Sequence, residues 1–224
     1  MIPSTVIEFR KKFDRERISR NYSATLHLAL TVGASSGVVL YSLFHLHGIQ
    51  PMEWLTIPVT FLYANMTEYV VHRVPMHHPI PGLWKVFEGH TLEHHHYFTD
   101  ESMEMDGMRS LSIILFPPIM MVLFLGIFAF PVAYLVGYLI SSNAGYLFLV
   151  VAMGYYANYE LFHLAYHMPG NSWVGRLPFM KSLRQQHTLH HDLRLMSSFC
   201  FNITYPIGDL IFRTMGPKRK GSAT

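Results

Sequence analysis

Two histidine-rich stretches carry most of the chemistry that this sequence offers. The first stretch runs from His72 to His96 and contains seven histidines, and the second contains five between His163 and His191. Only three of the 15 histidines lie elsewhere, namely His27, His45 and His47. Neutral imidazole is a ligand for iron, zinc, copper and nickel. Ten imidazoles with ligand spacing are too many for one metal ion and suit two.

The spacing of the histidines is the spacing that helical metal ligands use. Residues three or four apart share one face of a helix, so His163 and His167 are expected to point at one centre. The same is expected of His90 with His94, and of His187 with the next two histidines if that segment is helical. The predicted metal ligands are His72, His77, His90, His94, His95, His163, His167, His187, His190 and His191. The register of His78 and His96 relative to these ligands stays open.

The three isolated histidines are expected to be ordinary packed or solvent-facing residues and not metal ligands. A histidine run can also be a weak metal binder at a surface. Packing alone is a poor explanation for four clusters that each have ligand spacing. The clusters therefore favour a built metal centre.

Two carboxylates precede histidines within apolar segments. Glu68 lies four residues before His72, and Glu160 lies three before His163. A carboxylate inside a membrane is costly and is usually partnered. We expect each to accept a hydrogen bond from the second nitrogen of a ligand histidine, which fixes the tautomer of that ligand. The alternative is a pair of interfacial carboxylates that face lipid headgroups.

The composition indicates an integral membrane protein. Half of the 224 residues are hydrophobic and 14% are charged, against about 25% charged in an ordinary soluble domain. The net charge of +3 is small, which argues against a nucleic-acid partner. The single cysteine, Cys200, excludes a disulfide within the chain and a cysteine-type zinc site.

Four apolar segments are long enough to be membrane-spanning helices. They cover residues 24–46, 54–71, 118–140 and 146–167. Pro117 and Pro118 suit the start of the third helix, and the sequence SSNAG at 141–145 indicates a turn before the fourth. The predicted fold is therefore all-α, a four-helix transmembrane bundle.

The positive charges predict the orientation of this bundle. All 17 Lys and Arg fall within residues 10–20, 73–109 and 176–220, so the positive-inside rule places both termini and the central loop in the cytoplasm. The histidines then form a cytoplasmic metal-binding cap. The predicted organisation is one membrane domain with a basic amphipathic segment at 1–22 of the kind that lies on a membrane surface, four spans within 24–168, a histidine loop at 72–108, the cap at 169–214 and a flexible tail at 215–224.

Several longer motifs resemble the fatty acid hydroxylase and sterol desaturase superfamily of membrane di-iron enzymes. They are HRVPMH (72–77), HTLEHH (90–95), MRSLSIILFPP (108–118), GYYANYELFHLAYH (154–167) and LRQQHTLHHDLRLMSSFCFNITYPIGDLIFRT (183–214). They occur in the family's order and cover most of residues 68–214. FPP and YE-x-x-H (159–163) look closest to the fatty acid 2-hydroxylase branch. One departure is the three residues between the first two histidines of HTLEHH, where two are common in that branch.

The resemblance implies two iron ions bound by the histidines, with zinc as a possible occupant of a purified sample, and O2 as cosubstrate. It further implies a membrane lipid substrate and electrons from a separate cytochrome b5, ferredoxin or reductase. An active site facing the cytoplasm suits a bacterial inner membrane and an ER membrane equally. Tyr155, Asn158 and Tyr159 are candidates for a substrate entrance, although an aromatic belt at the membrane interface explains the tyrosines equally well.

Other functions remain open at this point. Within the same enzyme class, the alternatives are a sterol-type oxidase or desaturase and a carotenoid hydroxylase, and the sequence does not separate hydroxylation from desaturation. A membrane metal or haem carrier is the alternative outside enzymes. A carrier is expected to place polar residues near the middle of the membrane, whereas here the middles of the spans are apolar.

Overall fold

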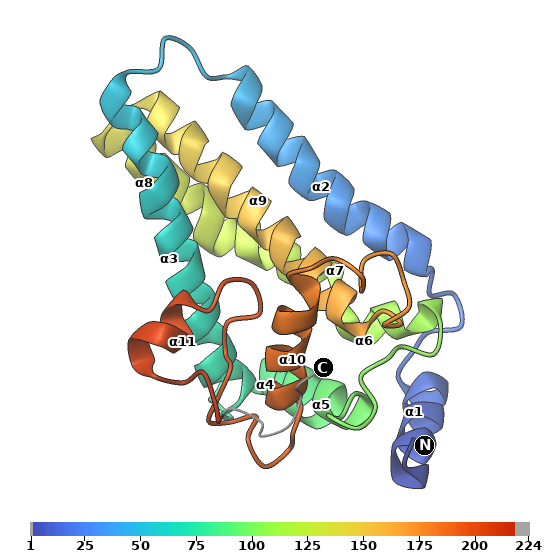
Figure 1. The fold of residues 1–224 in the computed structure, drawn as a ribbon. Helices are drawn as coiled ribbons and strands as arrows, with labels where there is room; N and C mark the ends of the chain where they lie inside the picture. Colours follow the sequence, from blue (N-terminus) through green and yellow to red (C-terminus); the bar gives the residue numbers. More distant parts are fainter. Residues whose placement is uncertain (1, 218–224) are drawn as a thin grey trace. The chain divides into compact units, whose positions relative to one another are not determined.

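The computed structural model describes residues 2–217, and their regular structure is helical (Figure 1). The α-helices are α1 (Ser4–Glu16), α2 (Ala24–Phe44), α3 (Thr56–Val71), α4 (Trp84–Phe87), α5 (His95–Tyr97), α6 (Leu111–Ile114), α7 (Pro118–Leu123), α8 (Phe130–Leu139), α9 (Ser142–His167), α10 (Met180–His190) and α11 (Ile207–Phe212). Two segments are 3-10 helices, η1 (Pro51–Leu55) and η4 (Met108–Ser110). Three are π-helices, η2 (His72–Met76), η3 (Glu88–His94) and η5 (Phe124–Ala129). The all-α prediction is confirmed.

These helices form two compact units. Among the described residues, the histidine-rich unit consists of residues 2–15, Met66–Met105 and residues 165–217. The apolar unit consists of Glu16–Asn65 and Asp106–Leu164. Helices α3 and α9 each contribute residues to both units. Of the predicted flexible tail at 215–224, residues 218–224 lie outside the described part of the chain.

Helices α2, α8 and α9 pack closely in the apolar unit. Its core contains small and large side chains in alternation, with Ala129, Ala133 and Ala152 against Phe148 and Leu149, and Val38 of α2 packs on the same cluster. Glycines allow the backbones of α8 and α9 to approach. A Cβ on Gly145 would lie 2.8 Å from the carbonyl oxygen of Ala133. Small residues at helix interfaces are typical of helices that pack within a membrane.

Within residues 2–217, two helical segments are long and apolar enough to cross a membrane, Ala24–Phe44 and Met108–Leu139. Their most apolar windows are only 22% buried within the protein. They expose large side chains such as Leu40, Phe44, Ile127 and Leu135. An exposed apolar surface of this kind suits lipid better than water. The predicted second and fourth spans correspond to α3, with 16 residues, and α9, with 26.

The turn predicted at 141–145 is shorter in the structure, because α9 begins at Ser142. The hydroxyl of Ser141 accepts a hydrogen bond from the backbone N–H of Ala144 at 3.1 Å. Ser141 therefore acts as the N-cap of the helix. The serine and asparagine that indicate a turn in the sequence are the start signal of the helix.

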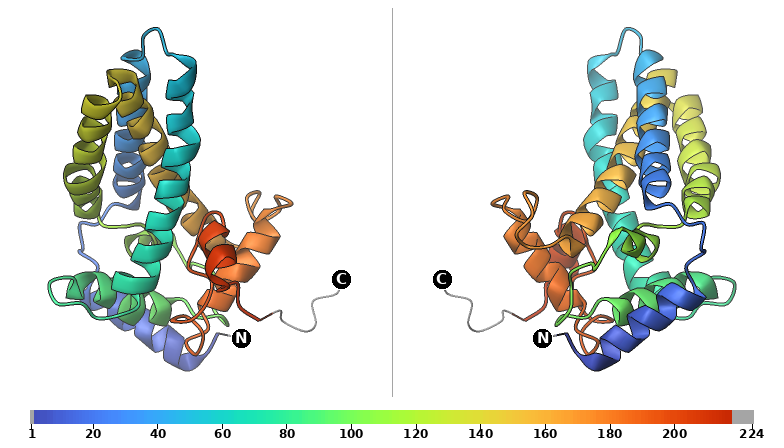
Figure 2. Two further views of the ribbon diagram at one scale, coloured as in Figure 1. Left: turned by 90° about the vertical axis from the view of Figure 1, so that its left-hand side faces the viewer. Right: turned by 90° about the vertical axis from the view of Figure 1, so that its right-hand side faces the viewer.

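Helix α1 packs on the histidine-rich unit through its apolar side. Phe13 meets Tyr97 edge to face with ring centroids 5.5 Å apart, and Val6 is buried. The two views of Figure 2 show α1 lying along the segment that contains α5. The apolar side of the predicted surface helix is thus occupied by its own unit.

Candidate metal centre

Ten buried histidines form two groups of five. The first group contains His72, His77, His90, His95 and His190, and the second contains His94, His163, His167, His187 and His191. Within each group, one ligand nitrogen per residue lies within 4.8 Å of all the others. His163 lies one turn before His167 on the continuous helix α9 and is the fifth member of its group. These ten are the histidines that the sequence predicts as ligands.

The π-helices η2 and η3 bring together four members of the first group, and the fifth, His190, is the last residue of α10. A π-helix bonds residues five apart, and the N–H of His95 accordingly donates to the carbonyl of His90 at the end of η3. His90 and His95 therefore approach, with Nε2 atoms 3.2 Å apart. His72 opens η2, and His77 follows five residues later with ring centroids 5.2 Å apart. Both pairs belong to the same group.

Helices α9 and α10 with its C-cap supply four members of the second group, and the π-helix η3 supplies the fifth, His94. His163 and His167 lie four apart on α9, and the Nε2 atoms of His187 and His191 at the end of α10 are 3.1 Å apart. The adjacent pairs His94–His95 and His190–His191 are divided between the groups.

This division corrects two expectations from the sequence. His90 and His94 do not share a group, because η3 is a π-helix and His90 is paired with His95. His187 and His190 do not share one either, because the four-residue spacing pairs His187 with His191. The expectation for His163 and His167 agrees with the structure.

The Nε2 atoms face one another at distances typical of ligands around one ion. The pairs His72–His90, His77–His190, His94–His191 and His167–His187 are separated by 2.9 Å, 3.0 Å, 3.2 Å and 3.1 Å. Two imidazole nitrogens at about 2.1 Å from a metal and at right angles are about 3.0 Å apart. The geometry fits two ions, one in each group.

Backbone carbonyl groups hold the second nitrogens of four of these histidines. Nδ1 of each donates to a carbonyl oxygen, and the pairs are His72 with Phe201 at 2.5 Å, His167 with Met103 at 2.8 Å, His190 with Phe199 at 2.9 Å and His191 with Phe98 at 2.6 Å. A carbonyl oxygen only accepts, so Nδ1 carries the proton and Nε2 keeps a lone pair for a metal.

Thr91 has the same role for His77. Its hydroxyl donates to the carbonyl of Met76 at 2.6 Å and accepts from Nδ1 of His77 at 3.2 Å. The Nε2 atoms of His77 and His190 therefore both carry lone pairs while they lie 3.0 Å apart. Two lone pairs repel at that distance unless a cation lies between them. This pair is the clearest sign that the group is built for a metal ion.

Burial keeps the imidazoles neutral. It lowers the pKa of His77 to about 2 and that of His190 to about 4, and neighbouring imidazoles lower the pKa of His77 further. Burial also lowers the pKa values of His90, His95 and His191 well below the usual range. The charged form is disfavoured because water is excluded. Neutral imidazole is the form that binds metals.

Two buried carboxylates hold the loop that carries the carbonyl of Phe201. Glu68 accepts from the N–H groups of Ile203 and Thr204 and from the Thr204 hydroxyl. Asp209 accepts from the N–H groups of Phe201 and Asn202 at 3.0 and 2.8 Å. Four consecutive N–H groups are thus bound by two carboxylates.

The proposed role of Glu68 changes accordingly. Its carboxylate oxygens accept hydrogen bonds from the loop 201–204. The hydrogen bond from Nδ1 of His72 is accepted by the carbonyl of Phe201 in that loop, not by the carboxylate. Glu160 accepts from the N–H of Phe116 at 3.2 Å, and its predicted bond to a ligand histidine stays a prediction. No feature of the sequence distinguished Asp209 or Thr91 from other residues of their type. The carbonyl acceptors of the histidines cannot be recognised from the sequence, because every residue has a backbone carbonyl.

The other candidate residues lie as follows. Tyr155 and Tyr159 are buried in α9, where Tyr155 accepts from Asn65 at 2.8 Å and Tyr159 stacks on Phe116. Asn158 is half-buried. Their role at a substrate entrance stays a prediction.

The remaining histidines lie outside the two groups. His78 is exposed, and Nδ1 of His96 bonds to the carbonyl of Thr91, which answers the question of their register. His27 is a packed residue that bonds to Tyr22 and to the carbonyl of Phe116.

Comparison with known proteins agrees with the geometry. Residues 57–214 match the fatty acid hydroxylase family, a range that contains all ten histidines. No curated protein and no solved structure matches the chain. Because most of the chain matches and its histidines form two groups suited to metal ions, the chain belongs to the fatty acid hydroxylase family of di-iron, histidine-motif oxidoreductases.

Proposed function

We propose that this protein hydroxylates the acyl chain of a membrane lipid, with O2 as cosubstrate and electrons from a separate donor protein. In such a reaction one oxygen atom enters a C–H bond and the other leaves as water, with two electrons and two protons supplied. The observation that carries the proposal is the convergence of ten neutral imidazoles in two groups of five. Two irons held there would supply the activation of O2 that side chains cannot perform.

The chain's own residues would hold and shield this chemistry. Phe98 is fully buried and packs on His167 with ring centroids 4.1 Å apart, and Phe201 lies about 6 Å from His72, His77 and His190. These rings exclude water from the Nε2 atoms. A dry site protects a reactive oxidant from side reactions.

We also propose the four-span topology, with both histidine stretches on the cytoplasmic side. The distribution of Lys and Arg supports it. A polar cluster also supports it, because it connects residues 47–53, which follow the first predicted span, with residues 141–145, which precede the fourth, and neither segment contains Lys or Arg. Asn143 bonds to the N–H and carbonyl of His47 at 3.1 and 2.8 Å and to Glu53 at 3.0 Å. Loops that meet in this way belong on one side of a membrane. Cysteines introduced at His47 and Lys85 should be labelled from opposite sides of sealed vesicles.

Several related functions remain alternatives. A desaturase, a sterol-type oxidase and a carotenoid hydroxylase would use the same two groups, and the 2-hydroxylase branch rests on the motifs FPP and YE-x-x-H alone. Tyr155, Asn158 and Tyr159 are proposed to line the path of the substrate. A metal or haem carrier is disfavoured, because the ten histidines are buried in two groups and hydrogen bonds fix the tautomer of five of them.

Whole-lipid mass spectrometry tests the proposal. A host with an electron donor would express the wild type, His187→Ala, or the control His78→Ala, which alters an exposed histidine of the first stretch. Lipids heavier by one oxygen are expected with the wild type and with His78→Ala, and not with His187→Ala. Lipids lighter by two hydrogens would identify a desaturase instead. Identical lipids from all three proteins would contradict the proposal.

A further inference from the structure

A short segment of irregular backbone supports two members of the second histidine group. We call residues 98–105 the strap. Its carbonyl groups at Phe98 and Met103 accept from Nδ1 of His191 and of His167. A turn forms its middle, where the N–H of Ser102 donates to the carbonyl of Thr99 at 2.8 Å. No regular helix holds these two carbonyls in place, so other contacts must do so.

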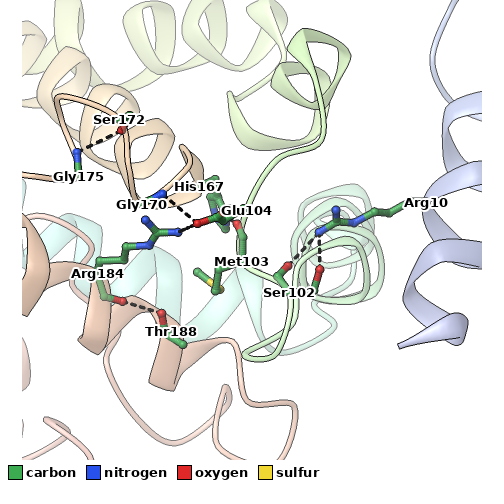
Figure 3. A network of polar contacts seen from close by, with 10 residues as sticks. All are labelled: Arg10, Ser102, Met103, Glu104, His167, Gly170, Ser172, Gly175, Arg184 and Thr188. Carbon is green, nitrogen blue, oxygen red and sulfur yellow. Dashed lines mark hydrogen bonds and ion pairs between the residues drawn. The ribbon is translucent and has the colours of Figure 1, made fainter. Parts of the chain in front are cut away.

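Arg10 of α1 binds the strap beside both of these carbonyls. Its Nε donates to the carbonyl of Tyr97 at 2.8 Å, and its Nη2 donates to the carbonyl and hydroxyl of Ser102 at 2.9 and 3.0 Å (Figure 3). Tyr97 and Ser102 directly precede the two residues whose carbonyls hold histidines. The guanidinium also lies 5.0 Å from the ring centroid of Tyr97 and 5.2 Å from that of Phe98.

The burial of Arg10 makes these bonds strong. Arg10 is only 4% exposed, although its neighbours Lys11 and Lys12 are exposed. Hydrogen bonds from a charged donor contribute more than neutral ones. The planar guanidinium also holds the carbonyls of Tyr97 and Ser102 in a fixed relative position, which the ammonium group of a lysine cannot do.

The other contacts of the strap are weaker or lie at its end. Glu104 accepts from Gly170 and from Arg184, and its side chain is 56% exposed (Figure 3). Exposed ion pairs contribute little. The N–H of Met105 bonds to the carbonyl of His167 at 2.8 Å. At the Phe98 end, the N–H of Phe98 donates to the carbonyl of His94 at 2.8 Å. Arg10 adds bonds at Tyr97 and at Ser102 and so connects the two parts of the strap that hold histidines.

We propose that Arg10 is a positioning residue for the second histidine group, acting through the strap on His167 and His191. The proposal rests on the proposed function in one respect, namely that this group binds a metal ion. It predicts selectivity, because the second nitrogens of His72, His77 and His190 in the first group bond to Phe201, Thr91 and Phe199 and not to the strap. Loss of the guanidinium should therefore weaken one metal site and spare the other.

Cobalt(II) binding to the purified full-length protein, freed of metal in detergent, tests this selectivity. The variant Arg10→Met keeps an unbranched apolar side chain close to the length of the arginine's aliphatic part and removes its donors. It would be placed in two backgrounds, His72→Ala, which disables the first group, and His187→Ala, which disables the second. In the His72→Ala background we expect Arg10→Met to weaken cobalt binding about tenfold or more, the size of effect typical of residues that orient metal ligands. In the His187→Ala background we expect less than a twofold change.

Controls separate positioning from general destabilisation. Lys11→Met removes an exposed charge from the same helix and should leave binding unchanged. Phe13→Ala removes packing of α1 but no bond to the strap, and it should lower the melting temperature without selective loss of cobalt. Arg10→Lys should fall between wild type and Arg10→Met. In the metal-free protein, hydrogen exchange of residues 98–105 should be faster in Arg10→Met than in Phe13→Ala.

Each contrary outcome has a distinct meaning. The role of Arg10 would be overturned if Arg10→Met weakened cobalt binding equally at both groups or at neither. It would also be overturned if Phe13→Ala selectively weakened cobalt binding at the second group. A wild type that binds two cobalt ions but forms no lipid product would overturn the proposed function and leave the inference on Arg10 standing. A wild type that binds no cobalt would overturn both.

Discussion

At the scale of single residues, the candidate ligands are oriented by the hydrogen bonds that their second ring nitrogens make. Carbonyl oxygens fix four of the ten histidines as Nδ1–H tautomers, and a threonine hydroxyl fixes a fifth. The Nε2 lone pairs are then available before any metal arrives. Preorganised ligands lose little freedom on binding, and this favours affinity.

Thr91 gives a direct test of this orientation. Thr91→Val has nearly the same shape but neither accepts from His77 nor donates to the carbonyl of Met76. We expect cobalt binding at the first group to weaken about tenfold, and the unfolding free energy to fall by about 1–3 kcal/mol because a buried acceptor loses its donor. Thr91→Ser should retain both properties. Equal binding by Thr91→Val and the wild type would show that the hydroxyl does not orient His77.

Cys200 is expected to be unreactive in the folded protein. Its thiol is buried and donates to the carbonyl of Met215 at 3.2 Å, and burial raises its pKa from 9.0 to about 12. The thiolate is the reactive form, so alkylation should be slow up to about pH 10 and should accelerate as the pH approaches 12. In urea the ordinary pKa returns and alkylation at pH 9 should be rapid. Iodoacetamide labelling followed by mass spectrometry measures this, and rapid labelling of the native protein at pH 8 would contradict it.

At this scale the sequence was sufficient to single out the ten histidines that the structure gathers into two groups, but not their hydrogen-bond partners. Histidine is uncommon enough that a cluster with helical spacing is itself a signal. The acceptors of the Nδ1 protons are mostly main-chain carbonyls far away in sequence, and every residue has one. The residues that place those carbonyls, Arg10 and Asp209, resemble any other charged residue until the fold brings them to the strap and to the loop 201–204.

At the scale of elements, the type of helix decides which histidines work together. The prediction assumed α-helical spacing throughout, which correctly pairs His163 with His167 on α9. It wrongly pairs His90 with His94, because η3 is a π-helix in which residues five apart meet. π-Helical turns are rare and often occur at functional sites, and no residue pattern in HTLEHH distinguishes one from an α-helix.

The loop 201–204 offers an element-scale prediction that mirrors the strap. Asp209→Asn replaces one of two acceptor oxygens by a donor that would face the N–H of Phe201 or Asn202. We expect weaker cobalt binding at the first group, because the loop carries the carbonyl that holds His72, and a loss of about 1.5–3 kcal/mol of unfolding free energy. The second group should be unaffected. Glu8→Gln makes the same chemical change at an exposed position outside the strap and serves as control, and selective loss at the second group would contradict the argument.

At the scale of the whole molecule, the two units have different kinds of core. The core of the apolar unit consists of contacts among alanine, phenylalanine, leucine and glycine residues. Long apolar segments of the sequence predict its helices. The histidine-rich unit buries aromatic side chains such as Tyr97, Phe98, Tyr166 and Phe201 together with a set of imidazoles and carboxylates, and these polar groups depend on their partners. Composition therefore indicated apolar helices, two of which, among the described residues, are long and apolar enough to cross a membrane, whereas the histidine groups had to be inferred from the spacing of their residues.

This difference predicts how the protein responds to the loss of metal. Without cations, Nε2 lone pairs such as those of His77 and His190 face each other in a dry interior, which is unfavourable. A metal at a thousand times its dissociation constant stabilises a folded protein by about 4 kcal/mol, and this contribution belongs to the histidine-rich unit. After treatment with a chelator, hydrogen exchange should accelerate in residues 72–104 and 180–206 and stay nearly constant in α2 and α8. Restoring iron or cobalt should reverse the change, while magnesium, which prefers oxygen ligands, should not. Uniform acceleration in both units would show that the metal stabilises the fold as a whole, and no acceleration would mean that the histidines are stable without an ion.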